Sequence, residues 1–185
     1  MTTTAPTRNG FDMQVVQQAA EDLAAQPSAA RVTFRGVTSW ERHVATEGRT
    51  VEMQQGGERV ARSFSFHGDH PPALLGEDTG PTAGEVLLAA LGACVAGTYA
   101  AHAAVRGITV DALDVEVAGS LDLRGYFQLD PDVRAGFDPV DVTLRVAADA
   151  SPEQLSQIAQ VVEHASPVFD SLSRGVQIRT ALQKV

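Results

Sequence analysis

One cysteine, Cys94, is the residue of this chain whose type could carry thiol chemistry. Nucleophilic attack needs the thiolate, which forms readily only beside a cation or at a helix N-terminus. Cys94 lies roughly three turns into an uncharged helical segment, where the helix dipole would help little. His102 follows about 12 Å along the same helix and is too distant to be its base. Two interpretations stay open: a thiolate activated by groups elsewhere in the fold or in a partner chain, or a small apolar core residue.

Two histidines and an aspartate, His67, Asp69 and His70, cluster in a loop rich in Gly and Pro. Imidazole and carboxylate groups bind metals such as zinc, so these residues are weak candidates for a metal site. No further ligand stands out in the sequence, and a solvated polar loop explains the cluster equally well. The glycine-rich nucleotide motifs and the metalloprotease motif are also missing from the sequence. We therefore expect no metal and no cofactor.

The balance of charges excludes two kinds of partner. The 185 residues contain 14 Lys and Arg against 23 Asp and Glu, a formal net charge of −9. Binding to nucleic acid or to an anionic membrane surface needs clustered positive charge. A single cysteine also excludes an intramolecular disulfide and a zinc site built on several cysteines. With no basic-then-apolar leader, we expect a soluble protein of the reducing cytoplasm.

The segment Val86–Val105 contains no charged residue and is long enough to cross a bilayer. Alanine and glycine dominate it, however, and Thr98, Tyr99 and His102 interrupt it. Small side chains add little to membrane transfer, and no basic flank or second apolar segment supports a span. The segment is therefore predicted to be a core helix, which ends at Gly107 in a left-handed conformation.

The hydrophobic pattern along the rest of the chain changes between helical and strand-like periods. Residues 1–9 are expected to be a frayed terminus, followed by a short amphipathic helix up to Pro27. Ser151 and Gln154 predict the start of a second long helix. Alternation of apolar residues predicts strands at 31–37, 40–46, 50–54, 59–66, 108–120, 140–147 and 176–182, with a hairpin turn at 55–58. The strands follow one another without regular helical crossovers, so we expect an α+β fold with antiparallel sheets.

The segment Gly80–Gly107 resembles the cysteine-bearing helix of the OsmC/Ohr family, the osmotically inducible and organic hydroperoxide resistance proteins. Three further segments continue the resemblance in the same order: Asp122–Gly125, Val133–Phe137 and Ser166–Asp170. The resemblance implies an OsmC-like α+β fold that forms an intertwined homodimer, with active sites at the interface.

The same resemblance divides the chain into an N-terminal extension with a short extra helix, 1–28, and an OsmC-like domain, 29–185. The antiparallel sheets of that domain are expected to pack on two main helices, at about 82–106 and 152–165. The N-terminal helix lies outside the resemblance.

The resemblance also implies roles for four residues. Peroxidase members of the family attack peroxide with one helical cysteine, which Cys94 matches, and an arginine and a glutamate assist the thiolate. Arg42 is the best match for the arginine, and Glu85 lies next to the expected glutamate position. Ser166 stands where the family's resolving cysteine is expected, so the chain resembles a single-cysteine branch.

The function implied is reduction of organic hydroperoxides by Cys94, with an external thiol reductant, in defence against oxidative stress. An alternative stays open: a non-catalytic dimer that binds an apolar or acidic small molecule, with Cys94 packed in the core. Both versions are homodimers that bind a small molecule, and neither binds nucleic acid or a membrane.

Overall fold

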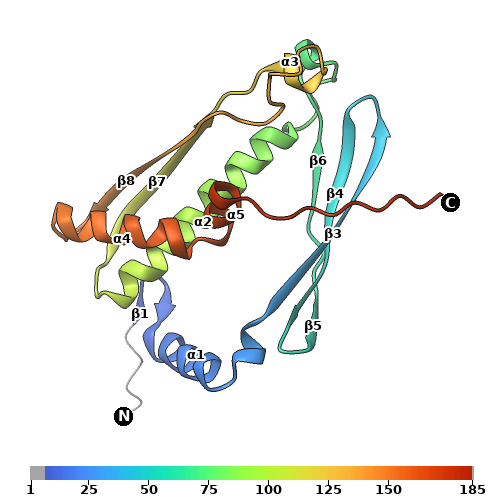
Figure 1. The fold of residues 1–185 in the computed structure, drawn as a ribbon. Coiled ribbons are helices and arrows are strands. Elements are labelled where there is room, and N and C mark those ends of the chain that lie inside the picture. Colours follow the sequence, from blue (N-terminus) through green and yellow to red (C-terminus); the bar gives the residue numbers. More distant parts are fainter. Residues whose placement is uncertain (1–6, 185) are drawn as a thin grey trace. The chain divides into compact units, whose positions relative to one another are not determined.

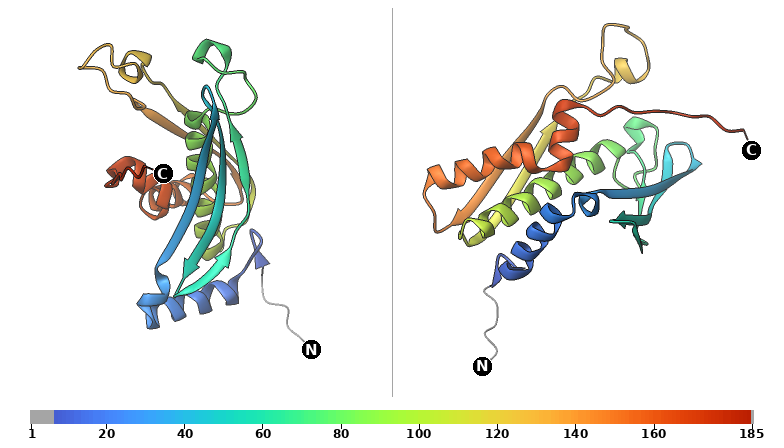
Figure 2. Two further views of the ribbon diagram at one scale, coloured as in Figure 1. Left: turned by 90° about the vertical axis from the view of Figure 1, so that its right-hand side faces the viewer. Right: turned by 60° about the horizontal axis from the view of Figure 1, so that its bottom comes forward.

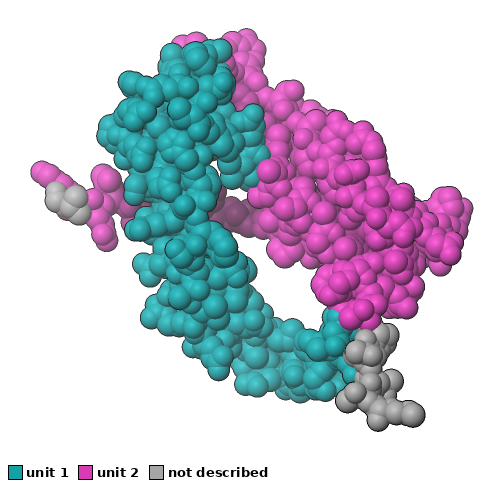
Figure 3. Space-filling view, turned by 180° about the vertical axis from the view of Figure 1, so that it is seen from behind, with its two compact units in different colours: residues 1–6, 12–87 teal, residues 7–11, 88–185 magenta. Residues whose placement is uncertain are grey.

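The computed structural model describes residues 7–184. The chain forms two compact units, residues 12–87 and residues 7–11 with 88–184 (Figure 3). Helices and antiparallel sheets make up both units, which confirms the predicted α+β class. Residues 1–6, part of the expected frayed terminus, lie outside the described residues. Residues 7–12 form a small hairpin of β1 (Thr7–Arg8) and β2 (Phe11–Asp12), so the expected frayed terminus is wrong for residues 7–9 and the helix begins two residues later than Phe11.

The first unit is built around one antiparallel sheet (Figure 1). Its predicted amphipathic helix is confirmed as α1 (Met13–Ala25), which the Asp12 side chain caps by accepting from Gln14 N–H and Val15 N–H. Strand β4 occupies the centre of the sheet and pairs with the three others. The strands are β3 (Val32–Arg42), β4 (Ala45–Gln55), β5 (Glu58–Ala61) and β6 (Ser65–Gly68), with short 3-10 turns at Pro27–Ala30 and Pro72–Leu74.

Two turns define this sheet, and the sequence predicts only one of them. The hairpin at 55–58 is confirmed: Gln55 pairs with Glu58 across Gly56 and Gly57, which both have positive φ. The second turn falls inside the predicted strand 40–46, which is therefore wrong. His43 adopts φ +46, and its carbonyl oxygen accepts a hydrogen bond of 3.0 Å from Trp40 Nε1, so the chain reverses there.

The second unit contains the buried core of the protein. Strands β7 (Val110–Gly119) and β8 (Val140–Ala148) pair antiparallel, with α2 (Ala83–Val105, shared between the units) and α4 (Pro152–Ala165) against them (Figures 1 and 2). The short helices α3 (Leu123–Tyr126) and α5 (Pro167–Arg174) complete it. The register places apolar pairs on the side facing the helices. The fully or nearly fully buried cluster is Leu91, Val95, Tyr99, Ala103, Ile108, Ile158 and Val162.

Helix α2 is the one helix within residues 7–184 that is long and apolar enough, by length and composition alone, to cross a membrane. The core helix of a soluble protein meets the same test. Four of its side chains, Leu91, Val95, Tyr99 and Ala103, belong to the buried cluster just described. The predicted packing of this helix in a core is therefore confirmed.

Local signals mark one end of each long helix. Gly107 has φ +81 after α2, as predicted for a left-handed terminator. The capping box of Ser151 and Gln154 at the start of α4 is also confirmed. An anchor that the sequence does not predict is Asn9, whose amide donates to the carbonyls of Ala100 and Ile108, both at 3.1 Å. This contact fastens the N-terminal residues to the end of α2.

The predicted last strand, 176–182, is wrong for the single chain. Residues 175–184 carry no helix or strand, and their apolar side chains are open to solvent, with Ile178 82% and Leu182 99% exposed. The alternation is real, but a strand exists only when its backbone groups have a partner, and within the described residues this segment has none.

Candidate active site around Cys94

Cys94 lies in the middle of α2, within the second unit, and its side chain is partly exposed. The neighbouring Leu91 and Val95 turn into the core and are 3% and 1% exposed. Cys94 therefore sits at the border of the core, with one side against protein and one side accessible. This position suits either interpretation of the thiol, so its polar contacts decide what it can do.

The polar contact of Cys94 is Ser166, whose hydroxyl donates a hydrogen bond to Cys94 Sγ at 3.1 Å. The two residues are 72 positions apart in the chain, and the side chain of Ser166 is fully buried. The fold therefore brings a polar group to the sulfur at the position that the resemblance assigns to a resolving cysteine.

The junction between two helices positions Ser166. Its backbone N–H donates to Val162 O at 2.9 Å and closes α4, while its hydroxyl oxygen accepts from Phe169 N–H at 3.5 Å and caps α5. Pro167 follows as the first residue of α5, where its missing N–H costs nothing. The Ser-Pro sequence thus ends one helix and starts the next, and fixes the hydroxyl against the sulfur.

Arg42, the predicted assisting arginine, lies at the end of β3 in the first unit. Its Nη2 forms a salt bridge of 2.6 Å with Glu77 Oε2, and His43 Nδ1 lies 3.8 Å from the other carboxylate oxygen. The hydrogen bond and the charge of Glu77 raise the pKa of Arg42, and Arg42 lowers the pKa of Glu77. Both side chains are about half exposed, so this pair orients the guanidinium more than it stabilises the fold.

Within the described residues of the single chain, Arg42 pairs with Glu77 and not with Glu85. Glu85 forms a capping box with Thr82 at the start of α2 instead. Its carboxylate accepts from Thr82 N–H at 2.7 Å, and its own N–H donates to Thr82 Oγ1 at 3.1 Å. The Thr82 backbone donor lowers the pKa of Glu85. The hydrogen bond from Thr82 N–H satisfies the Glu85 carboxylate at the start of α2, so Glu85 does not pair with Arg42.

The loop that carries Glu77 is organised by a buried carboxylate, Asp69, which is 2% exposed. Its Oδ2 accepts from Glu77 N–H at 3.1 Å, from Thr79 N–H at 3.1 Å and from Thr79 Oγ1 at 2.7 Å. The hydrogen bonds from Thr79 hold the pKa of Asp69 well below its usual range. Asp69 therefore fixes the backbone of Glu77, and Glu77 in turn holds Arg42.

These contacts also explain the histidine and aspartate cluster that the sequence offered as weak metal ligands. His67 Nε2 lies 3.0 Å from Thr79 Oγ1, the hydroxyl that donates to Asp69. Across residues 7–184, no three His, Cys, Asp or Glu side chains form a group that could hold a metal ion. Asp69 and His67 thus form hydrogen bonds within the loop that runs from His67 to Thr79.

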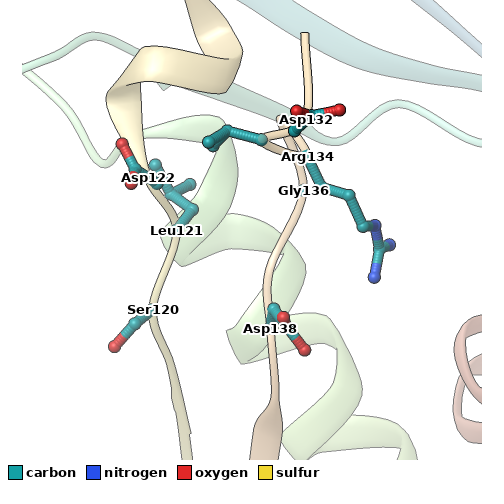
Figure 4. A pocket seen from close by; sticks show the side chains of 8 residues that line it. Ser120, Leu121, Asp122, Asp132, Arg134, Gly136 and Asp138 are labelled. Carbon is teal, nitrogen blue, oxygen red and sulfur yellow. The ribbon is translucent and has the colours of Figure 1, made fainter. Parts of the chain in front are cut away.

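A pocket of about 480 Å³ opens among the loops at 120–138 of the second unit (Figure 4). Leu121 and Asp122 lie on one segment, and Asp132, Arg134 and Gly136 lie on the segment that faces it. The sequence did not predict a site here, although two segments of the family resemblance, Asp122–Gly125 and Val133–Phe137, supply half of its lining. Its full lining is Ser120, Leu121, Asp122, Asp132, Val133, Arg134, Gly136 and Asp138.

The α+β fold carries one cysteine on a central helix, and the Ser166 hydroxyl donates a hydrogen bond to its sulfur. This arrangement is a candidate site for thiol chemistry. The model of the OsmC-like protein family matches residues 76–181, which is more than half of the chain. The chain belongs to this family. The expected OsmC/Ohr resemblance is thereby confirmed.

Solved structures agree on the fold at low sequence identity. The chain is similar to an OsmC-like protein from Mycoplasma pneumoniae, with 16% identity and a TM-score of 0.61 over 76% of this chain and 87% of that one. An OsmC-like protein of unknown function from Vibrio cholerae is 14% identical, with a TM-score of 0.56 over 75% and 92% of the two chains. An organic hydroperoxide resistance protein from Elizabethkingia anophelis is 13% identical, with a TM-score of 0.52 over 75% and 86%. No curated protein matches the chain.

Proposed function

We propose that the protein is a thiol-dependent peroxidase that reduces organic hydroperoxides through Cys94, in defence against oxidative stress. The observation that carries this proposal is a partly exposed cysteine on the family's central helix, with a buried hydroxyl donating to its sulfur. The hydroperoxide resistance named for the Elizabethkingia anophelis relative supports the choice of substrate class. A single unpaired thiol also suits the reducing cytoplasm.

The chemistry would begin with attack of the Cys94 thiolate on the outer oxygen of the hydroperoxide. A sulfur–oxygen bond forms and the oxygen–oxygen bond breaks, so the sulfur becomes a sulfenic acid and the alkoxide takes a proton to leave as an alcohol. The chain has no second cysteine, so reduction needs an external thiol. One thiol displaces water to form a mixed disulfide, and a second thiol releases a disulfide and restores Cys94.

Arg42 is assigned to stabilise the Cys94 thiolate and to orient the peroxide. A guanidinium suits both tasks because it keeps its charge and offers several N–H donors in a fixed plane. Glu77, rather than Glu85, would hold it in position, since the 2.6 Å salt bridge already fixes the guanidinium.

A homodimer is part of the proposal, because the single chain leaves large apolar surfaces uncovered. All eleven residues of β3 are exposed, including Phe34 at 77% and Trp40 at 71%. The C-terminal segment 176–182 adds a row of exposed apolar side chains with free backbone groups. A second copy would cover both surfaces.

Light scattering should therefore give twice the chain mass of 19.5 kDa, because the dimer buries these apolar surfaces. A monomer at micromolar concentration would contradict the proposed dimer.

We assign residues 29–185 to the OsmC-like domain and residues 1–28 to an extension. The family model begins at residue 76, and the solved relatives cover about three quarters of this chain, which leaves room for such an extension.

A non-catalytic binding protein is the second candidate, and the pocket at 120–138 favours it. The pocket has apolar lining from Leu121 and Val133 beside its aspartates, and it would accept a small molecule without any thiol chemistry. In this version Cys94 only packs at the border of the core.

Steady-state consumption of an organic hydroperoxide separates the two candidates. With dithiothreitol as the reductant, we expect wild-type protein to consume cumene hydroperoxide about a hundredfold faster than the Cys94→Ser variant, because a hydroxyl is a far weaker nucleophile. The Ser171→Ala variant removes a hydroxyl on α5 that donates to Pro167 O, and it should match wild type. Equal rates for wild type and Cys94→Ser would reject the proposed peroxidase function and leave the non-catalytic binding function as the remaining candidate.

A further inference from the structure

We propose that Ser166 is a positioning residue for the thiol chemistry: its hydroxyl donates a hydrogen bond that orients the Cys94 sulfur and stabilises the sulfur in its anionic form. The proposal rests on the peroxidase function for its purpose, but its test does not need peroxide. It gives Ser166 a chemical task in place of the redox exchange that a cysteine there would perform.

The direction of the hydrogen bond follows from the partners of the hydroxyl. Among the described residues, Ser166 Oγ contacts two polar groups, Phe169 N–H and Cys94 Sγ. The amide can only donate, so the oxygen accepts from it and the hydroxyl proton is free for the sulfur, which as a thiolate can only accept. A hydrogen bond to a charged acceptor is worth more than one to a neutral acceptor, so this donor favours the thiolate over the thiol.

Burial strengthens the same contact. Ser166 is fully buried, so water does not compete for its hydroxyl proton. A buried hydroxyl without an acceptor would lose the free energy of its bond to water, which keeps the proton directed at Cys94.

The backbone around Ser166 prevents the hydroxyl from swinging away. Its N–H donates to Val162 O and its carbonyl oxygen accepts from Asp170 N–H, both at 2.9 Å. The residue is thus held from both sides by α4 and α5. A donor already in place costs no reorganisation when charge develops on the sulfur.

The test is the rate of alkylation of Cys94 by iodoacetamide as a function of pH, which reports one thiol because the chain has one cysteine. For Ser166→Ala we expect alkylation at neutral pH to be about tenfold slower than in wild type, with the whole profile moved toward alkaline pH, since a charge-assisted hydrogen bond is lost. Ser166→Thr restores a hydroxyl and should restore the wild-type profile. Ser171→Ala removes an exposed hydroxyl on the same helix and should change nothing.

The opposite result is equally clear. A Ser166→Ala profile that coincides with that of wild type would overturn the proposal and leave Ser166 as a helix cap. If the alanine variant does not fold, Ser166→Gly gives the same reading, because glycine is tolerated at a helix N-cap. Since no hydroperoxide is present, a failed peroxidase assay with a shifted alkylation profile would reject the proposed function and keep the role of Ser166.

Discussion

Replacing Ser166 with cysteine is expected to create a disulfide to Cys94 as soon as hydroperoxide oxidises the protein. The Ser166 oxygen lies 3.1 Å from Cys94 Sγ. A sulfur in its place would lie a few tenths of an ångström nearer, because a C–S bond is longer than a C–O bond, and small rotations of the two side chains would then bring the sulfurs to the disulfide bond length of about 2.05 Å. The new thiolate would attack the Cys94 sulfenic acid, and water would leave. The variant would then behave as a two-cysteine peroxidase.

Mass spectrometry and thiol titration measure this directly. After one equivalent of cumene hydroperoxide, Ser166→Cys should lose both thiols within one chain, and dithiothreitol should restore them. The disulfide should also protect the variant from an excess of hydroperoxide that converts wild-type Cys94 irreversibly to the sulfinic acid. A matched control is Ser173→Cys, on the exposed side of α5, which should keep its second thiol free. Two free thiols, or only disulfides between chains, in Ser166→Cys would contradict the geometry.

Arg42 is expected to control how fast Cys94 reacts with hydroperoxide. Arg42→Ala should slow the second-order reaction about a hundredfold, because the variant lacks the charged donor that the proposed mechanism assigns to the thiolate and the peroxide. Glu77→Gln should slow it about tenfold, since the neutral amide holds the guanidinium less firmly. Glu85→Gln should leave the rate near that of wild type, because Glu85 caps α2.

The comparison of Glu77→Gln with Glu85→Gln decides which glutamate holds Arg42 in position. Rates are measured as loss of the Cys94 thiol under excess cumene hydroperoxide, with thermal unfolding as a check on the fold. Arg42→Lys should recover only part of the rate, since an ammonium keeps the charge but not the planar pair of donors. A larger loss in Glu85→Gln than in Glu77→Gln would restore the original assignment and reject the one argued from the structure.

Features fixed by short-range signals could be predicted from the sequence. The capping box of Ser151 and Gln154 and the glycine pair at 56–57 depend on residues that lie next to one another, and both are confirmed. The turn at His43 depends on a contact from the Trp40 indole that no local pattern indicates. The segment 176–182 has the alternation of a strand, but alternation cannot show whether a partner strand exists within the same chain.

The candidate site divides in the same way. Nothing in local spacing could place Ser166 beside Cys94, 72 residues away, and only the resemblance to a family indicated it. Glu77 was missed because its place depends on three hydrogen bonds that converge on Asp69 after the chain folds. For Glu85 a signal was present: Thr82 followed three residues later by a glutamate is a capping box, and it competes with any catalytic role.

One measurement tests most directly whether Cys94 is the peroxidatic nucleophile. Wild-type protein, freed of reductant, is mixed with one equivalent of cumene hydroperoxide in the presence of dimedone, which traps sulfenic acids, and the modified peptide and the released alcohol are both quantified. We predict one dimedone adduct at Cys94 for each molecule of alcohol formed. An unmodified Cys94 thiol with the hydroperoxide still intact would contradict the account.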